Sequence, residues 1–581
     1  MSVIKLPTSR SNLLVSAFLL FILRLPAQQL QPAAMPSGHR PATPFFSNPI
    51  LAGFYPDPSI CRVDSDYYLI NSSFAYYPGI PVFHSRDLVN WQQIGNAIDR
   101  PGQLDYHFNG VSRGLFAPAI RYHDGIFFIT CTQVDFLGNF VIMARDPRGP
   151  WSIALALDSV NGIDPSLFFD DDDKAYIVYN SVAPDNHPQY EGHRTIRLRV
   201  FDPKACRTIG EEKILVNGGS DPAKKPVWIE GPHLFKKDGR YYLIAAEGGT
   251  AFAHSEVVFR SENVTGPYLP YTGNPILTQR ELDPARPSPI TSTGHADLVM
   301  TPSGDWYAVF LGCRPYTGDY YNTGRETFMA PVKWKDGWPV ILPPGGIVEE
   351  YYPVPFPKDT ARVSDRYNGH APFKENFDGP AFDPSLVVLR TTPGKWYDLS
   401  ERKGFLTVPL VPETCSGEPA FIGHRQQTAR GSATTALDFH PPADNEKAGL
   451  LVFQNPNHFY FICRSVVDHR PVVQLFRAPV TSPDIAAAYA GNMELLATHV
   501  LDDASAGGLL QLKIVAKGDT YAFYYAEKKG GWHLLKDAVD AKYLSTKVAG
   551  GFVGCMYALY ATSLGKPSQA RACFDWLATT P

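Results

Sequence analysis

The sequence predicts an all-β protein, a five-bladed β-propeller followed by a jelly-roll-like β-sandwich, and three observations support this prediction. Aromatic residues make up 13% of the 581 residues, and the chain holds 52 Pro beside 47 Gly. Aromatic side chains favour pleated, half-buried strands, whereas Pro and Gly favour turns. A hairpin pattern recurs five times in the first half of the chain, and short alternating strands fill the last third. These features argue against helical bundles and coiled coils.

Residues 1–27 have the pattern of a signal peptide. Lys5 and Arg10 precede an apolar run from Leu13 to Leu23, which is too short to span a bilayer comfortably. Residues 28–44 are polar and Pro-rich, and we predict that they form a linker. We therefore expect a secreted or periplasmic protein without a membrane anchor. The alternative is that the apolar run forms a buried strand or helix of the fold.

Charge and cysteine usage narrow the classes of partner. The formal net charge is −4 and charged residues make up 19%, so the chain lacks the basic surface that nucleic acid or anionic lipid requires. None of the eight cysteines has CxxC spacing, which argues against a zinc knuckle, and eight are too few for a disulfide scaffold. We expect mostly buried thiols, although spacing alone does not decide whether any pair is bridged.

Four of the five repeated hairpins carry two adjacent aromatic residues after a polar turn, and the third carries one. The first or single aromatic residue of each hairpin is Tyr67, Phe127, Tyr176, Tyr241 or Trp306. These positions are separated by 60, 49, 65 and 65 residues. Units of about 50 to 65 residues suit four-stranded blades around a central channel. We therefore predict a five-bladed propeller at 45–352; the alternative is a sandwich whose hairpins resemble one another by chance.

A Pro-rich stretch at 353–372 is predicted to link the propeller to a β-sandwich at 373–581. Alternating strands are predicted at 405–408, 448–453, 460–462, 510–516, 521–525 and 552–553. Only 483–496 shows a helical period. Short strands of this kind, separated by turn residues, are typical of antiparallel sandwiches.

Three acidic residues share one register within the repeat. Asp57, Asp164 and Glu230 precede the first aromatic residue of their units by 10, 12 and 11 residues. Nearly equal offsets place them on the same strand of three blades, so we expect their side chains to meet at one end of the channel. Each acid alone is more typical of a turn, because Asp-Pro is a common turn dipeptide that also occurs at Asp383. The shared register favours a functional site.

The segments around these acids resemble the signature segments of glycoside hydrolase family 43. They are Gly-Phe-Tyr-Pro-Asp-Pro-Ser-Ile at 53–60, Ile-Asp-Pro-Ser-Leu-Phe at 163–168 and Glu-Gly-Pro-His-Leu at 230–234. Segments 293–299 and 324–328 resemble two more, and the C-terminal region resembles the sandwich of the family's β-xylosidases. The resemblance implies a five-bladed propeller and an oligosaccharide substrate. We expect no nucleic-acid or membrane partner, and the oligomeric state does not follow from the sequence.

The resemblance also implies catalytic roles. Asp57 would be the general base that activates water, Glu230 the general acid, and Asp164 the residue that positions Glu230 and raises its pKa. An inverting glycosidase needs one ionised and one protonated carboxyl group, about 6.5–9.5 Å apart. The implied activity is an exo-acting β-1,4-xylosidase that releases xylose from non-reducing ends. The nearest alternative is an α-L-arabinofuranosidase or a bifunctional enzyme, and a remote one is a non-catalytic sugar-binding propeller.

By the same resemblance, five residues would bind substrate: Phe74, Phe116, His295, Arg325 and Phe552. Phe116 stands where many relatives carry Trp, which leaves the shape of the subsite open. Phe552 would reach from the sandwich to close one end of the pocket, unless it is an ordinary core residue. No cofactor is required. His295 is a candidate ligand for a calcium ion in the channel, or else a hydrogen-bonded core histidine, and Arg325 has the alternative of a surface ion pair with the neighbouring glutamate.

Overall fold

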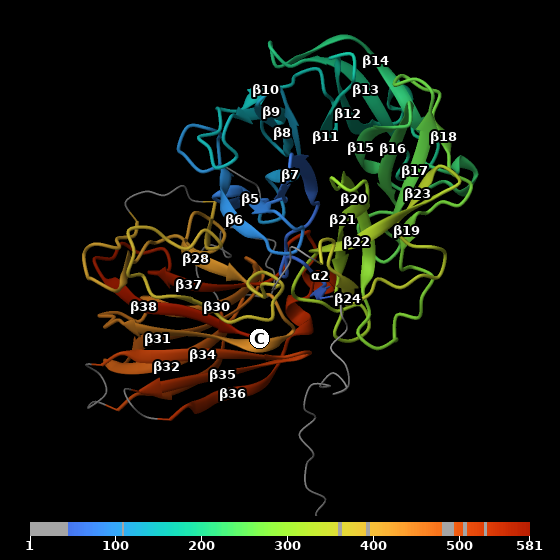
Figure 1. The fold of residues 1–581 in the computed structure, drawn as a ribbon. Coiled ribbons are helices and arrows are strands. Elements are labelled where there is room, and N and C mark those ends of the chain that lie inside the picture. The colour runs from blue at the N-terminus through green and yellow to red at the C-terminus, as the bar shows by residue number, and fades with distance from the viewer. Residues whose placement is uncertain are drawn as a thin grey trace, which may run out of the picture. The chain divides into compact units, whose positions relative to one another are not determined.

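Five antiparallel sheets arise from residues 59–340, one from each repeated hairpin, and confirm the five-bladed propeller (Figure 1). The computed structural model describes residues 44–106, 110–357, 363–390, 396–478, 493–502, 508–527 and 531–581. Each blade begins with the strand nearest the axis, and the first strands of neighbouring blades contact one another around the channel. The paired aromatic residues lie on the second strand of each blade, as the repeat predicts.

The strands of each blade follow one another along the chain. Blade 1 contains β2 (Ser59–Val63), β3 (Asp66–Ile70), β5 (Gly79–Ser85) and β6 (Gln92–Ile98). Blade 2 contains β7 (Leu115–His123), β8 (Ile126–Gln133), β9 (Gly138–Ala144) and β10 (Leu155–Ala156). Blade 3 contains β11 (Ile163–Phe169), β12 (Ala175–Val182), β13 (Arg194–Asp202) and β14 (Arg207–Asn217). Blade 4 contains β15 (Glu230–Lys237), β16 (Arg240–Glu247), β17 (Ser255–Ser261), β18 (Leu269–Pro270) and β19 (Leu277–Thr278). Blade 5 contains β20 (Thr291–Met300), β21 (Trp306–Cys313), β22 (Glu326–Lys335) and β23 (Trp338–Val340).

The ring of blades is closed by the segment that precedes blade 1. Strand β1 (Phe45–Ser47) pairs with β24 (Tyr351–Pro353), which follows blade 5. The amides of Ile50 and Leu51 donate to the carbonyl oxygen of Thr327 in β22, at 2.9 and 3.2 Å. Backbone hydrogen bonds therefore join the two ends of the propeller sequence.

A residue with left-handed backbone occurs at the same point of every blade, at or just before the first strand. The five residues are Asp57, Ala117, Asp164, Gly231 and His295, with φ between +33° and +57°. In blades 2 to 5 the pairing of the first two strands shifts register at this point, as in a β-bulge. A bulge redirects the side chains beside it, which is why bulges are frequent next to active sites. The register inferred from the repeat is therefore a property of the backbone.

Two residues beyond each left-handed residue, a second row of side chains faces the channel, one layer below the left-handed residues. This row consists of Ser59, Ala119, Ser166, His233 and Asp297. All five residues are buried, and four of them carry a polar group. Only blade 2 contributes an apolar side chain to the row, which leaves a gap in the polar layer.

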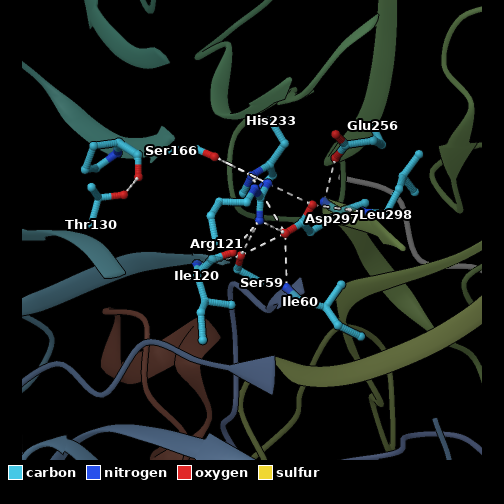
Figure 2. Close-up of polar contacts among 12 residues, drawn as sticks. Ser59, Ile60, Ile120, Arg121, Thr130, Ser166, His233, Glu256, Asp297 and Leu298 are labelled. Carbon is cyan, nitrogen blue, oxygen red and sulfur yellow. Dashed lines mark hydrogen bonds and ion pairs between the residues drawn. The ribbon is translucent and has the colours of Figure 1, made fainter. Parts of the chain in front are cut away.

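Arg121, on the first strand of blade 2, fills that gap (Figure 2). Its Nη1 donates to Oδ2 of Asp297 at 2.8 Å, and its Nη2 lies 3.2 Å from Oδ1 of the same carboxylate and 2.9 Å from Nδ1 of His233. Burial lowers the pKa of His233 to about 3, so its ring is neutral and Nδ1 accepts the hydrogen bond. The hydroxyl of Ser59 donates to Asp297 at 2.8 Å. The hydroxyl oxygen of Ser166 lies 2.9 Å from Nδ1 of His233 and accepts from Nη2 of Arg121 at 3.4 Å. One guanidinium thus connects all five blades.

The C-terminal region is a sandwich of two antiparallel sheets with an apolar core between them. One sheet contains β25 (Phe373–Glu375), β27 (Leu406–Pro409), β29 (Arg430–Asp438), β34 (Leu510–Lys517), β35 (Thr520–Glu527), β36 (His533–Asp540) and β38 (Arg571–Thr580). The other contains β4 (Tyr76–Tyr77), β26 (Val387–Leu389), β28 (Ala420–Arg425), β30 (Lys447–Asn455), β31 (His458–Val467), β32 (Arg470–Arg477), β33 (Glu494–Val500) and β37 (Met556–Thr562).

Two details of the predicted sandwich differ from the structure. The end of the predicted helical period, at 494–496, belongs to strand β33, and 483–492 lies outside the described residues. The predicted strand at 552–553 is wrong, because these residues form a loop between the short helix α2 (Thr546–Ala549) and β37. This loop leaves the sandwich sheet to contact the propeller.

Strand β4 comes from blade 1 of the propeller but belongs to a sandwich sheet. It pairs with β26, with Tyr77 opposite Val388 and Tyr76 opposite Leu389. Both tyrosines are almost fully buried. Backbone hydrogen bonds of a shared sheet therefore join the propeller to the sandwich.

All eight cysteines are free thiols, and only Cys573 is not fully buried. Within the described residues, no helix is long and apolar enough to cross a membrane. The signal peptide predicted at 1–27 and all but the last residue of the linker predicted at 28–44 lie outside the described residues.

We expect Arg121→Met to lower the free energy of unfolding by about 3–5 kcal/mol, because it leaves the carboxylate of Asp297 buried without a countercharge. Arg148→Met is the matched control, because it breaks an exposed ion pair with Asp146 and should cost less than about 1 kcal/mol. Urea titration of both variants measures the difference. Equal losses in the two variants would contradict the axial role of Arg121.

Candidate active site

A cavity of about 480 Å³ lies at the end of the channel where the left-handed residues gather. Its lining contains every residue that the sequence analysis singled out: Asp57, Phe74, Phe116, Asp164, Glu230, His295, Arg325 and Phe552. Seven of these residues come from the five blades and one comes from the sandwich. The acids predicted to meet on the basis of their register therefore face one hollow.

Asp57 is surrounded by groups that stabilise its charged form. The hydroxyl of Ser72 donates to Oδ2 at 2.6 Å, Nη1 of Arg325 donates to Oδ1 at 3.2 Å, and Nδ1 of His295 lies 3.8 Å from Oδ1. Burial alone would raise the pKa of Asp57, but these three neighbours outweigh burial and hold the pKa below its ordinary value. Asp57 is therefore an ionised carboxylate at neutral pH.

Glu230 has the opposite environment in the same cavity. Burial, reinforced by the negative charge of Asp164, raises the pKa of Glu230 to about 8, although Arg325 opposes the shift. Burial also raises the pKa of Asp164, and the charge of Asp57 adds to that shift. The cavity thus holds a protonated Glu230 beside an ionised Asp57 at neutral pH. This is the pair of protonation states that general acid and general base catalysis requires.

Asp164 also fixes the backbone next to Glu230. Its Oδ2 accepts a hydrogen bond of 3.0 Å from the amide of Gly231. Gly231 has φ +57°, and a Cβ atom there would lie only 2.8 Å from the ring of His295. Glycine is therefore required directly after Glu230. Asp164 both accepts the hydrogen bond of the Gly231 amide and raises the pKa of Glu230.

Three phenylalanines form a wall at one end of the cavity. The ring centroids of Phe74 and Phe116 are 5.5 Å apart, those of Phe116 and Phe552 are 5.7 Å apart, and those of Phe74 and Phe552 are 6.4 Å apart. The guanidinium of Arg325 lies 5.4 Å from the centroid of Phe552. The amide of Phe552 donates to the hydroxyl of Ser112 at 2.8 Å, which fastens the sandwich loop to the propeller. Phe552 therefore lines the cavity, and it also packs against the apolar core.

The cavity also contains residues that the sequence analysis missed. Arg113, Arg194, Val227, Trp228 and Thr250 belong to the lining. The Arg194 guanidinium lies 4.3 Å from the centroid of the Trp228 ring. Trp228 lies two residues before Glu230, so its nearness in sequence was a usable signal. Arg194 enters from β13, and nothing in the local sequence connects it with the acids.

The donor set does not fit the calcium ion suggested for His295. Among the described residues, no cluster of three or more His, Cys, Asp or Glu side chains could hold a metal ion. His295 faces Asp57, which already pairs with Arg325. One layer below, the acceptors of Asp297 and His233 are engaged by Arg121, so a second cation there would be repelled.

Comparison with known families matches both parts of the chain. Residues 46–339 match the model of glycosyl hydrolases family 43, and residues 374–580 match a β-xylosidase C-terminal concanavalin A-like domain. A xylosidase/arabinosidase of Butyrivibrio fibrisolvens is 40% identical over 530 residues, which cover 90% of this chain and 97% of the relative. A non-reducing end α-L-arabinofuranosidase of Bacteroides ovatus is 34% identical, covering 91% of this chain and 94% of the relative.

Solved structures of similar length share the same fold. The GH43B protein of a Bacteroides ovatus xyloglucan locus is 33% identical, with a TM-score of 0.80 over 92% of this chain and 99% of its own. A xylan β-1,4-xylosidase from Bacillus halodurans is 28% identical, with a TM-score of 0.80 over 92% of this chain and 100% of its own. Both similarities extend over the propeller and the sandwich.

We expect Asp164→Asn to lower the pKa of Glu230 by about one unit or more, because it removes a negative charge that favours the protonated form. The infrared band of the protonated carboxyl group, assigned by its loss in Glu230→Gln, measures this pKa directly. Asp146→Asn, on the exposed surface, is the control and should leave the titration unchanged. An unshifted Glu230 band in Asp164→Asn would contradict the coupling.

Proposed function

Because this chain belongs to glycosyl hydrolases family 43 and is therefore a glycoside hydrolase, we propose that it is an exo-acting β-1,4-xylosidase. It would release xylose from the non-reducing ends of xylo-oligosaccharides with inversion of the anomeric centre. The observation that carries this proposal is that an ionised Asp57 and a protonated Glu230 face one cavity with an aromatic wall at one end. Family membership excludes the alternative of a non-catalytic sugar-binding propeller.

The proposed reaction is a single displacement. Asp57 removes a proton from a water molecule as the water oxygen bonds to the anomeric carbon. On the opposite face, the bond from that carbon to the glycosidic oxygen breaks, and this oxygen takes the proton of Glu230. Xylose leaves with inverted configuration, the shortened oligosaccharide leaves as an alcohol, and the proton that Asp57 holds returns to Glu230 through solvent. Asp164 positions Glu230 and keeps its proton in place before the reaction.

Exo action is supported by the wall that Phe74, Phe116 and Phe552 form. These rings make direct contacts with one another, so an oligosaccharide cannot continue between them. A terminal sugar would bind against the wall, with Arg325 beside its hydroxyl groups and the rest of the chain pointing away. The wall therefore favours chain ends over internal positions.

An α-L-arabinofuranosidase, or an enzyme with both activities, is the second candidate. The relative from Butyrivibrio fibrisolvens carries both activities in its name, and the relative from Bacteroides ovatus is named for arabinofuranose. The match to a β-xylosidase C-terminal domain supports xylose as the first choice. Export from the cytoplasm stays a prediction that depends on residues 1–27, which lie outside the described part of the chain.

We expect Glu230→Gln to lower kcat on xylobiose by about 10³-fold or more, because glutamine cannot protonate the departing oxygen. The loss should be much smaller on β-xylosyl fluoride, because fluoride leaves without a proton. Steady-state kinetics on the two substrates measure the difference. Equal losses on both substrates would contradict the general-acid role of Glu230.

The wild-type protein should have a larger kcat/KM on nitrophenyl xyloside than on nitrophenyl arabinofuranoside. Proton NMR during the first minutes of xylobiose hydrolysis should show α-xylose, the inverted product, before mutarotation. A larger kcat/KM on the arabinofuranoside would make the second candidate the primary activity. Release of β-xylose first would overturn the single-displacement reaction.

A further inference from the structure

The cavity has two unlike sides, and the proposed reaction gives no role to Arg194, Val227 and Trp228, which line one of them. The side near Asp57 is closed by the phenylalanine wall. The side around Glu230 is lined by Arg194, Val227 and Trp228. Val227 is 40% exposed and Trp228 is 38% exposed, although both are large apolar side chains. Exposed apolar surface that adjoins a reactive pocket is typical of a binding surface.

The backbone that carries the Trp228 indole is held on both sides. Its amide donates to the carbonyl oxygen of Gly192 at 2.9 Å, and the Val227 carbonyl oxygen accepts from Gly248 at 2.8 Å. A Cβ atom at Gly192 would lie 3.1 Å from Cδ1 of Trp228, so glycine permits the close approach. Trp228 also has φ +54°, a conformation that is costly for a bulky residue and is found mainly where function requires it.

Arg194 supports this indole. Its guanidinium lies 4.3 Å from the ring centroid, within the range of a cation–π interaction. In the part of the chain that the structure describes, the Arg194 side chain has no hydrogen-bond or ion-pair partner, although it lines the cavity. Its N–H groups therefore remain available to hydroxyl groups of a ligand, while its plane holds the ring.

The proposed chemistry determines what would bind at this place. A general acid protonates the oxygen between the released sugar and the leaving group, so the leaving group lies on the acid's side of the reacting bond. Trp228 is two residues from Glu230, and both line the same cavity. A leaving group protonated by Glu230 therefore comes next to the indole.

We propose that Trp228, supported by Arg194, is the platform for the leaving sugar, so that the protein selects substrates whose leaving group is a pyranose ring with an apolar C–H face. This inference rests on the proposed function. The C–H face of a pyranose is apolar and stacks on an indole, while its equatorial hydroxyl groups reach donors at the ring edge. Trp228 would thus be a specificity-determining residue on the side of the cavity opposite the phenylalanine wall.

The test compares kcat/KM on xylobiose with kcat/KM on β-xylosyl fluoride, whose leaving group is too small to reach the indole. In Trp228→Ala the ratio of the two values should fall about 10-fold or more, and Trp228→Phe should restore most of it. Arg194→Met should lower the same ratio about 3-fold, because the indole loses its support. An unchanged ratio in Trp228→Ala overturns the inference. A ratio in Trp228→Phe that is no higher than the ratio in Trp228→Ala also overturns it.

Trp532→Ala is the matched control. Trp532 is 39% exposed and also has a cation above its ring, Lys513 at 4.6 Å, but it lies on the sandwich outside the cavity lining. Its ratio should equal that of the wild type. If the wild type cleaves xylobiose and Trp228→Ala has the same ratio as the wild type, only the role of Trp228 as a platform is overturned. A wild type that leaves xylobiose intact overturns the proposed function, and the platform with it.

Discussion

The guanidinium of Arg121 connects the five strands on which the active site is built. Its bonds to Asp297 and His233, extended by Ser59 and Ser166, place one hydrogen-bonded contact in every blade at a single depth of the channel. The left-handed residues that shape the cavity floor lie two positions away on the same strands. The relative positions of the carboxyl groups therefore depend on how firmly this layer holds the blades together. An arginine suits the task because it stays charged and offers several donors in one plane.

Above this layer, the cavity gives two carboxyl groups of similar intrinsic acidity different protonation states: Asp57 is ionised and Glu230 is protonated. Both are buried, so desolvation alone would protonate both. The difference comes from their neighbours. Arg325 and Ser72 contact Asp57 and favour its charged form, whereas the negative charge of Asp164 adds to the effect of burial on Glu230. A short distance between unlike microenvironments is what allows one protein to present an acid and a base at the same pH.

The sequence was sufficient to locate the three acids because the repeat register follows the backbone register to within one residue. Asp57 and Asp164 are themselves left-handed, and Glu230 directly precedes the left-handed Gly231. Arg121 could not be found in this way, since its role follows from the small side chain of Ala119 two residues earlier and from partners on the four other blades. The strand predicted at 552–553 was wrong for a related reason. Alternating apolar residues fit a strand, but Phe552 is apolar because it faces the cavity across a domain boundary.

Strand β4 has a consequence for how this architecture can change. Phe74 lies two residues before β4, and Phe552 lies four residues before β37, so two members of the phenylalanine wall are attached to the same sandwich sheet. The sandwich is therefore not a detachable module, because its removal would leave β4 without its partner strand β26 and would also open the blind end of the pocket. The sandwich therefore helps to determine whether the pocket accepts only chain ends. A small shift of the sandwich relative to the propeller would open the wall and would allow cleavage within a chain.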